Sequence, residues 1–195
     1  MIVAVILAAG ESARLGRPKQ LLEYRGKTLI GHAIEAARSS SCDEIIVVVG
    51  AHADAITKEL ERYPVRIVNN PNWKEGKASS IRAAVNAESQ QPEVCSGILF
   101  MTCDQPYLPV SALKDLLDRF RVHGNRPVAT AYANTIGIPA VIPRRLFGKL
   151  MELTGDQGAQ AILQALPGEV SAVACAQGSF DVDCPNDLEQ LHADG

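Results

Sequence analysis

Short apolar segments rich in β-branched residues recur along the whole chain, and this recurrence restricts the possible folds more than any other feature of the sequence. Several of them are nearly continuous apolar runs, which is typical of strands that are covered on both faces. The predicted strands span residues 2–7, 44–49, 65–68, 97–102, 128–133 and 170–174. A sheet built from such strands needs helices packed above and below it.

Segments with helical spacing lie between these strands, at residues 28–38, 53–62, 77–87, 110–122, 144–153, 159–166 and 185–192. Because strand and helix alternate almost throughout, the sequence predicts a three-layer α/β/α fold with a mostly parallel sheet. The chain has 195 residues, of which 47% are hydrophobic. That length supports one well-cored domain over residues 1–195 and does not require two.

Charge and cysteine content exclude several classes of function. A net charge of −3 argues against binding to nucleic acid or to an anionic membrane. The five cysteines have no C-x-x-C spacing and form no ligand pattern with the four histidines, so we interpret them as free thiols. The apolar start of the chain is too short for a signal peptide, and no run has the length of a membrane span. We expect a cytoplasmic protein with a small-molecule partner.

A loop of small residues with two cations follows the first predicted strand, in the sequence LAAGESARLGRPK from Leu7 to Lys19. Small residues let backbone N–H groups approach a ligand closely, and this loop begins with Ala8, Ala9 and Gly10. Arg14 and Lys19 add positive charge beside those N–H groups. The combination predicts a binding site for the triphosphate of a nucleotide.

The spacing in this loop matches neither of the common phosphate motifs. Gly10 and Gly16, both free to adopt positive φ, are separated by five residues, and Lys19 follows Gly16 by three. This is not the G-x-x-x-x-G-K-[ST] of a P-loop, and the absence of G-x-G-x-x-G leaves a dinucleotide-binding fold without support. The alternative is an ordinary strand-to-helix loop with a solvated Arg14 and Lys19.

One carboxylate follows the predicted strand 97–102, in the sequence TCDQP. The carboxyl ends of parallel strands meet at one edge of a sheet, so Asp104 is expected to face the first loop. Magnesium prefers one or two carboxylates together with phosphate oxygens and water, and Asp104 meets that preference. The alternative is that Asp104 only begins a turn before Pro106.

A second acidic segment, FDVDCPND, precedes the last predicted helix. Asp181 and Asp183 share one side of an extended segment, whereas Asp187 falls in the first turn of a helix opened by Pro185. We interpret Asp183 as a second metal ligand and Asp187 as a helix-start residue.

Three further segments carry candidate binding groups. Ser79 and Ser80 open the predicted helix 77–87, whose free N–H groups predict an anion or base-edge site, and the alternative is plain first-turn residues. The segment GIPA, from Gly137, and the segment LTGDQGA are expected to be flexible turns. The second turn holds Asp156, for which an Asx-type turn is the alternative.

Together these segments resemble the molybdenum cofactor nucleotidyltransferases, a MobA-like family, and specifically its MocA-like cytidylyltransferase branch. The resemblance is carried, in order, by LAAGESARLGRPK, GKASSIRAA, TCDQP, GIPA, LTGDQGA and FDVDCPND. It covers nearly the whole chain and implies a Rossmann-like nucleotidyltransferase fold. The first motif is shared with sugar-phosphate and isoprenoid-precursor nucleotidyltransferases, whereas LTGDQGA after GIPA is narrower. The guanylyltransferase branch typically has Gly where this chain has Ala9, which favours CTP.

The resemblance also implies a role for each motif. The residues implied to bind the nucleotide are Leu7, Ala8, Ala9, Gly10, Arg14, Lys19, Ser79, Ser80 and Asp104. Those implied to act in catalysis are Lys19, Arg14 and Asp104, and those implied to hold Mg²⁺ are Asp104 and Asp183. The implied molybdopterin side comprises Gly137, Pro139 and Asp156. Two positions depart from the family pattern: Cys184 replaces a frequent Thr, and Gln160 replaces a basic residue that often follows GDxGA.

The implied reaction is attack by the terminal phosphate of the molybdopterin molybdenum cofactor on the α-phosphorus of CTP, which yields the cytosine dinucleotide and pyrophosphate. An ionised phosphate needs no general base, so catalysis reduces to positioning and to charge screening by Mg²⁺, Lys19 and Arg14. The alternatives are transfer to another phosphate such as a sugar 1-phosphate, guanylyl transfer to molybdopterin, and a non-catalytic chaperone that inserts the cofactor into a client molybdoenzyme. A dinucleotide-dependent oxidoreductase is disfavoured because its glycine fingerprint is missing.

Overall fold

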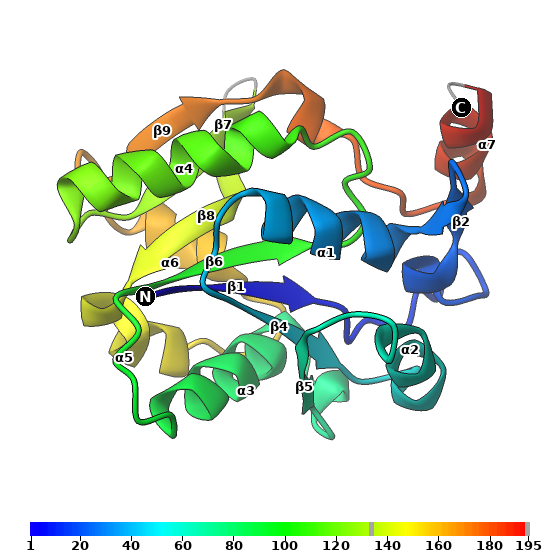
Figure 1. The fold of residues 1–195 in the computed structure, drawn as a ribbon, viewed down its shortest axis with the longest axis horizontal. Coiled ribbons are helices and arrows are strands. Elements are labelled where there is room, and N and C mark those ends of the chain that lie inside the picture. The colour runs from blue at the N-terminus through cyan, green and yellow to red at the C-terminus, as the bar shows by residue number, and fades with distance from the viewer. Residues whose placement is uncertain (133–134, 194–195) are drawn as a thin grey trace.

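The computed structural model describes residues 1–132 and 135–193, and Figure 1 shows their arrangement around a seven-stranded sheet. The strand order is β5-β4-β1-β6-β8-β7-β9. The strands are β1 (Ile2–Leu7), β4 (Glu44–Val49), β5 (Arg66–Asn69), β6 (Gly97–Thr102), β7 (Val128–Tyr132), β8 (Thr135–Pro143) and β9 (Ser171–Ala174). Only β8 pairs antiparallel with its neighbours in this sheet, and the other described pairs are parallel. The predicted, mostly parallel sheet is therefore confirmed.

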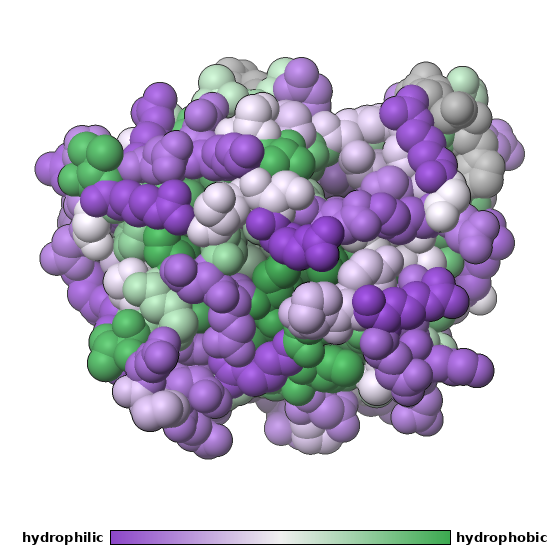
Figure 2. All heavy atoms as spheres, viewed as in Figure 1, coloured by the Kyte–Doolittle hydropathy of each residue, from purple (hydrophilic) through white to green (hydrophobic). Residues whose placement is uncertain are grey.

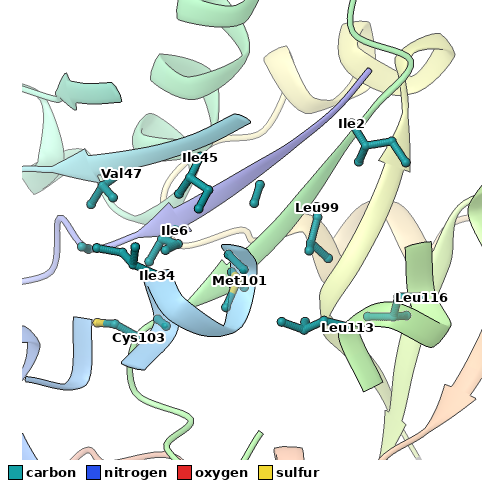
Figure 3. Packing of buried hydrophobic residues seen from close by; sticks show 14 of the residues in the cluster. Ile2, Ile6, Ile34, Ile45, Val47, Leu99, Met101, Cys103, Leu113 and Leu116 are labelled. Carbon is teal, nitrogen blue, oxygen red and sulfur yellow. The ribbon is translucent and has the colours of Figure 1, made fainter. Parts of the chain in front are cut away.

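Helices cover both faces of this sheet. One face carries α1 (Leu29–Ser39), α2 (Ala53–Leu60) and α4 (Val110–His123), and the other carries α3 (Lys77–Ser89), α5 (Phe147–Met151) and α6 (Ala159–Gln164). Consecutive residues of β1 alternate between the two apolar clusters: Ile6 packs with the first helices, shown in Figure 3, and Val5 with the second. A strand buried on both faces explains the continuous apolar run in the sequence.

The predicted boundaries agree closely with the observed elements. Strands β1, β4 and β6 have the predicted bounds, and α4 ends one residue later than predicted. The helix predicted over residues 144–153 is a 3₁₀ turn, η3 (Arg144–Leu146), followed by α5. The predicted strand 128–133 corresponds to β7, whereas its last residue, Ala133, lies outside the described residues.

Strand β8 corrects the sequence prediction, because GIPA was expected to be a flexible turn and forms part of this strand instead. Ala140 pairs with Phe100 of β6 and with Ala129 of β7. The register of β7 and β8 then shifts, so Ile138 and Pro139 have no paired residue opposite them on β7. A proline has no N–H to donate, so such an irregularity lets it lie inside a sheet.

A small unit lies beside the main sheet; its hairpin was not predicted, whereas its helix corresponds to the predicted helix 185–192. It consists of a hairpin, β2 (Glu23–Tyr24) with β3 (Lys27–Thr28), and of the last helix, α7 (Pro185–Ala193). Thr28, predicted to begin a helix, is the N-cap of α1, and its hydroxyl accepts a hydrogen bond from the Gly31 N–H at 3.1 Å. A third apolar cluster joins the hairpin to α7 and contains Leu22, Tyr24, Leu29, Val182 and Leu191.

Hydrophilic side chains cover most of the face seen in Figure 2, and apolar side chains show in smaller areas between them. Two of the large exposed apolar residues, Val94 and Val122, lie on different segments, before β6 and on α4. Within the described part of the chain, every helix is too short or too polar to cross a membrane.

The start of α7 is closed by Asp187, which confirms its interpretation as a helix-start residue. One oxygen of its carboxylate accepts hydrogen bonds from the backbone N–H groups of Asp183, at 2.9 Å, and Cys184, at 2.8 Å. Since Pro185 is the first helical residue, Cys184 is the N-cap and Asp187 supplies one half of a capping box. The other half needs a hydroxyl acceptor at the N-cap, which Cys184 does not have.

We expect the substitution Cys184→Thr to raise the free energy of unfolding by about 0.5–1 kcal/mol, because the threonine hydroxyl completes the capping box. In a chain of this size that corresponds to about 1–4 °C in melting temperature. Thermal and urea denaturation measure the change. The matched control is Cys184→Ala, and an equal gain in the alanine variant would contradict the capping explanation.

Candidate active site

The loop after β1 continues the pairing of the sheet before it turns away. The Ala8 N–H donates to the Val48 carbonyl at 2.9 Å, and the Ala9 carbonyl accepts from the Ala51 N–H at 3.1 Å. Leu7 is half-buried, Ala8 and Ala9 are buried, and Gly10 is exposed. The loop therefore leaves the sheet at the carboxyl ends of β1 and β6. After β1 the chain continues to β4 and β5 on one side of this strand, and it then returns to β6 on the other side. Ligands bind at such a reversal of strand order in open α/β sheets.

Beyond Gly10 the loop leaves a series of backbone donors available. Within the described residues, the N–H groups of residues 9–14 donate to no protein acceptor. Gly16 adopts a positive φ of 65°, as its freedom allows. Gly10 does not adopt a positive φ, and the other residue of the loop that does is Ser12, with φ of 58°. Such a run of free N–H groups is suited to bind an anion.

Lys19 lies between two carboxylates that come from distant parts of the chain. Its Nζ is 2.5 Å from Asp104 Oδ2 and 2.7 Å from Asp183 Oδ1. Arg14 is more exposed and contacts the other oxygen of Asp183 at 2.9 Å. The structure thus brings together all four charged residues that the sequence analysis singled out for phosphate and metal binding.

Three elements place these side chains. Lys19 begins the 3₁₀ turn η1 (Lys19–Leu21), and its N–H donates to the Ser12 hydroxyl at 3.1 Å. Asp104 lies two residues beyond the end of β6. Asp183 is held beside it because the neighbouring Val182 N–H donates to the Asp104 carbonyl at 2.9 Å.

The ion pairs change the proton affinities of this cluster. Burial alone would lower the pKa of Lys19, but the Asp104 and Asp183 carboxylates outweigh it and the pKa is raised. Desolvation would raise the pKa of Asp183, but the hydrogen bond from Lys19 and the nearby cations lower it. Desolvation and the Asp104 charge raise the pKa of Asp181, a third carboxylate, to about 6. Lys19 and Asp183 are therefore charged at neutral pH.

The carboxylates of Asp104 and Asp183 fit a magnesium ion whose other ligands come from a phosphate substrate and water. Asp104 Oδ1 is buried and has no hydrogen-bond partner in the described chain. In the same residues no group of three His, Cys, Asp or Glu side chains converges to hold a metal ion. Magnesium takes one or two carboxylates together with phosphate oxygens and water, which agrees with two aspartates beside an anion-binding loop.

Ser79 and Ser80 lie at the start of α3, but their hydroxyls are engaged with the protein. Both accept hydrogen bonds from the Asn70 side-chain amide, at 2.8 and 3.0 Å, and all three side chains are buried. The Ser79 hydroxyl donates in turn to the Gly76 carbonyl. These contacts stabilise the turn before α3, and the seating of a base by Ser79 and Ser80 stays a prediction.

The segment that contains Asp156 packs against this turn. The Ala78 N–H donates to the Gly155 carbonyl at 3.0 Å. Gly76 has φ of 100°, and a Cβ at this position would lie 2.4 Å from the Gly155 carbonyl oxygen. The close contact requires glycine and holds the exposed Asp156 beside the start of α3.

Gly137 and Pro139 are buried in β8 and do not lie in an open turn. Because β8 is antiparallel to β6 and Ala140 pairs with Phe100, the residues before Ala140 lie toward the carboxyl end of β6. They therefore belong to the same edge of the sheet as Asp104. The Pro139 carbonyl accepts from the Thr130 hydroxyl at 2.6 Å, so this oxygen is occupied.

Two residues of this site were missed by the sequence analysis. Gln20 is buried and its side-chain amide donates to the carbonyls of Ala8 and Gly10. Asn70 holds Ser79 and Ser80 as described above. Nothing in the sequence marks either residue, because a polar residue in a short polar segment is usually exposed.

Comparisons with known proteins identify the family and the fold of this chain. A family model for the MobA-like NTP transferase domain matches residues 4–170. A protein of Paenarthrobacter nicotinovorans named nicotine blue oxidoreductase is 34% identical over 200 residues, which cover 98% of this chain and 95% of the relative.

Solved structures show the same likeness. The crystal structure of an Rv0371c homolog from Mycobacterium sp. strain JC1 superposes with a TM-score of 0.84 at 34% identity, covering 99% of this chain and 96% of the other. Rv0371c of Mycobacterium tuberculosis, in complex with manganese, gives a TM-score of 0.79 at 29% identity and covers 97% of both chains. The fold is that of the nucleotidyltransferases, and this chain belongs to the MobA-like NTP transferase family.

Proposed function

We propose that this protein is a cytidylyltransferase that transfers CMP from CTP to the terminal phosphate of the molybdopterin molybdenum cofactor and releases pyrophosphate. The observation that carries the proposal is the position of Lys19 between Asp104 and Asp183, beside a loop with free N–H groups. A triphosphate needs such donors and cations, and membership of an NTP transferase family supports the nucleotide.

The proposed reaction needs positioning and charge screening from this chain. The attacking phosphate is already ionised, so no side chain has to accept a proton from it. The loop N–H groups orient the triphosphate, and Lys19 and Arg14 stabilise the charge that develops on the departing pyrophosphate. Asp104 and Asp183 would hold Mg²⁺, which neutralises phosphate charge when bound. The manganese complex of Rv0371c supports a divalent cation in this fold.

The choice of substrates depends on the sequence resemblance. Ala9, where the guanylyl-transferring branch typically has Gly, supports CTP. Gly137, Pro139 and Asp156 are proposed to border the molybdopterin side, and their places at the carboxyl edge of the sheet and beside α3 support this. A client molybdoenzyme would receive the product.

The name of the Paenarthrobacter relative, an oxidoreductase, raises an oxidation–reduction reaction as a second candidate. The loop after β1 has no G-x-G-x-x-G, which the dinucleotide-binding motif uses to approach a pyrophosphate. Addition of NADH or NADPH with an electron acceptor tests this candidate, and nicotinamide oxidation without nucleotide transfer would favour it.

The deciding experiment incubates the purified protein with Mg²⁺, the molybdopterin molybdenum cofactor and each of the four NTPs in turn. We expect pyrophosphate release with CTP and a cytosine dinucleotide by mass spectrometry. A guanine dinucleotide would identify guanylyl transfer, and transfer only to a sugar 1-phosphate would identify another acceptor. Tight cofactor binding without NTP consumption would identify an insertion chaperone.

Lys19→Ala and Asp104→Ala are each expected to reduce turnover by about 10²-fold or more, a typical loss for one electrostatic stabiliser. The measurement is CTP-dependent pyrophosphate release at saturating substrates. Lys114→Ala and Asp115→Ala, on the exposed side of α4, are the matched controls and should leave turnover unchanged. Wild-type turnover in Asp104→Ala would reject its role as a metal ligand.

Asp183→Asn is expected to change CTP affinity in opposite directions with and without Mg²⁺. Without metal, the substitution removes a carboxylate that competes for Lys19 and Arg14, so CTP should bind about threefold more tightly, the size of an exposed ion pair. With Mg²⁺, the loss of a ligand should weaken binding. Isothermal titration calorimetry in EDTA and in Mg²⁺ measures both values, and a change of the same sign in both buffers would contradict the assignment.

A further inference from the structure

We infer that Gln20 is a positioning residue for nucleotide binding, which holds residues 8–10 so that the free N–H groups of the loop face the ligand. This inference rests on the proposed binding of a nucleoside triphosphate by that loop. Gln20 is 1% exposed, so it acts through the loop and does not contact the ligand.

The orientation of the Gln20 side chain is set by the loop. Its Nε2 donates to the Ala8 carbonyl at 2.9 Å and to the Gly10 carbonyl at 3.0 Å, which uses both hydrogens of the amide. Its Oε1 is buried and has no partner in the described chain. A flipped amide would place Oε1 against two carbonyl oxygens, so only one orientation is favourable.

These hydrogen bonds fix the direction of successive peptide groups. The Ala8 and Gly10 carbonyls point to Gln20, and the Ala9 carbonyl between them accepts from the Ala51 N–H, in the turn between β4 and α2. Three carbonyls in a row are therefore held by the protein. Peptide groups are planar, so the N–H groups that follow these carbonyls are held as well, and their donors are arranged before a ligand binds.

Gln20 also connects this part of the loop to the cation. It lies in η1 next to Lys19, whose N–H donates to the Ser12 hydroxyl. Two adjacent residues thus bind two parts of the loop: Gln20 binds Ala8 and Gly10, and Lys19 binds Ser12. Loss of the Gln20 hydrogen bonds should therefore disturb the N–H donors and the position of the Lys19 ammonium relative to them.

Two substitutions separate the hydrogen bonds from the volume of the side chain. Gln20→Met keeps the length and removes both donors, and Gln20→Glu keeps the shape but places a carboxylate oxygen against the carbonyls. We expect the Kd for CTP with Mg²⁺, measured by isothermal titration calorimetry, to rise about 10-fold in Gln20→Met. The rise should be larger in Gln20→Glu, because repulsion replaces an attraction.

A matched control tests whether any loss of a buried hydrogen bond has this effect. Ser40 is also 1% exposed, and its hydroxyl donates to the Ala37 carbonyl at 2.7 Å at the far end of α1. Ser40→Ala should lower the melting temperature by an amount similar to Gln20→Met, with no change in the Kd for CTP. Equal Kd values in Gln20→Met and the wild type would overturn the inference, as would an equal rise in Ser40→Ala.

A measurement on the wild-type protein tests the inference even if the variants fail to fold. The hydrogens of the Gln20 side-chain amide should exchange slowly with D₂O. The ¹H–¹⁵N NMR signals of this amide should shift when CTP and Mg²⁺ are added. Fast exchange together with unshifted signals in a protein that binds CTP would reject the role of Gln20 and leave the proposed function intact. If the wild type binds none of the four NTPs, the proposed function and this inference both fail.

Discussion

The ion pairs of Lys19 join three parts of the molecule that are far apart in the sequence. The ammonium lies in the turn after the first loop, Asp104 lies two residues beyond the central strand β6, and Asp183 precedes the last helix. A half-buried cation is stable there only because two carboxylates compensate for its loss of water. The arrangement of the loop, of the carboxyl edge of the sheet and of the unit that contains α7 depends on this compensation.

The sheet makes that meeting possible. β1 and β6 are adjacent and parallel, so the loop after one and the aspartate after the other leave the sheet side by side. The helices on both faces bury residues 2–6 of β1, and polar groups gather at the carboxyl end of the strand. The fold thus supplies the position, and the small residues and charges of the loop supply the chemistry.

Much of this arrangement could be predicted from the sequence because it depends on local patterns. The continuous apolar run of β1 predicts a buried strand, and the loop of small residues follows it. Asp104 comes after a similar run, so the loop and Asp104 could both be placed at the carboxyl edge of the sheet. Strand β8 was missed because glycine and proline hide its pattern, and only pairing with both neighbours holds it in the sheet. Gln20 and Asn70 were missed because their burial comes from tertiary contacts that no local spacing encodes.

The apolar cluster between the hairpin and α7 has a consequence for the motions of the protein. Val182 and Leu191 pack with Tyr24, while Asp183, next to Val182, holds Lys19. Local opening of α7 and separation of that ion pair are therefore linked, and each lowers the free-energy cost of the other. Slow fluctuations at this end of the chain should accordingly be sensed at the loop after β1, although no backbone hydrogen bond of the main sheet has to break.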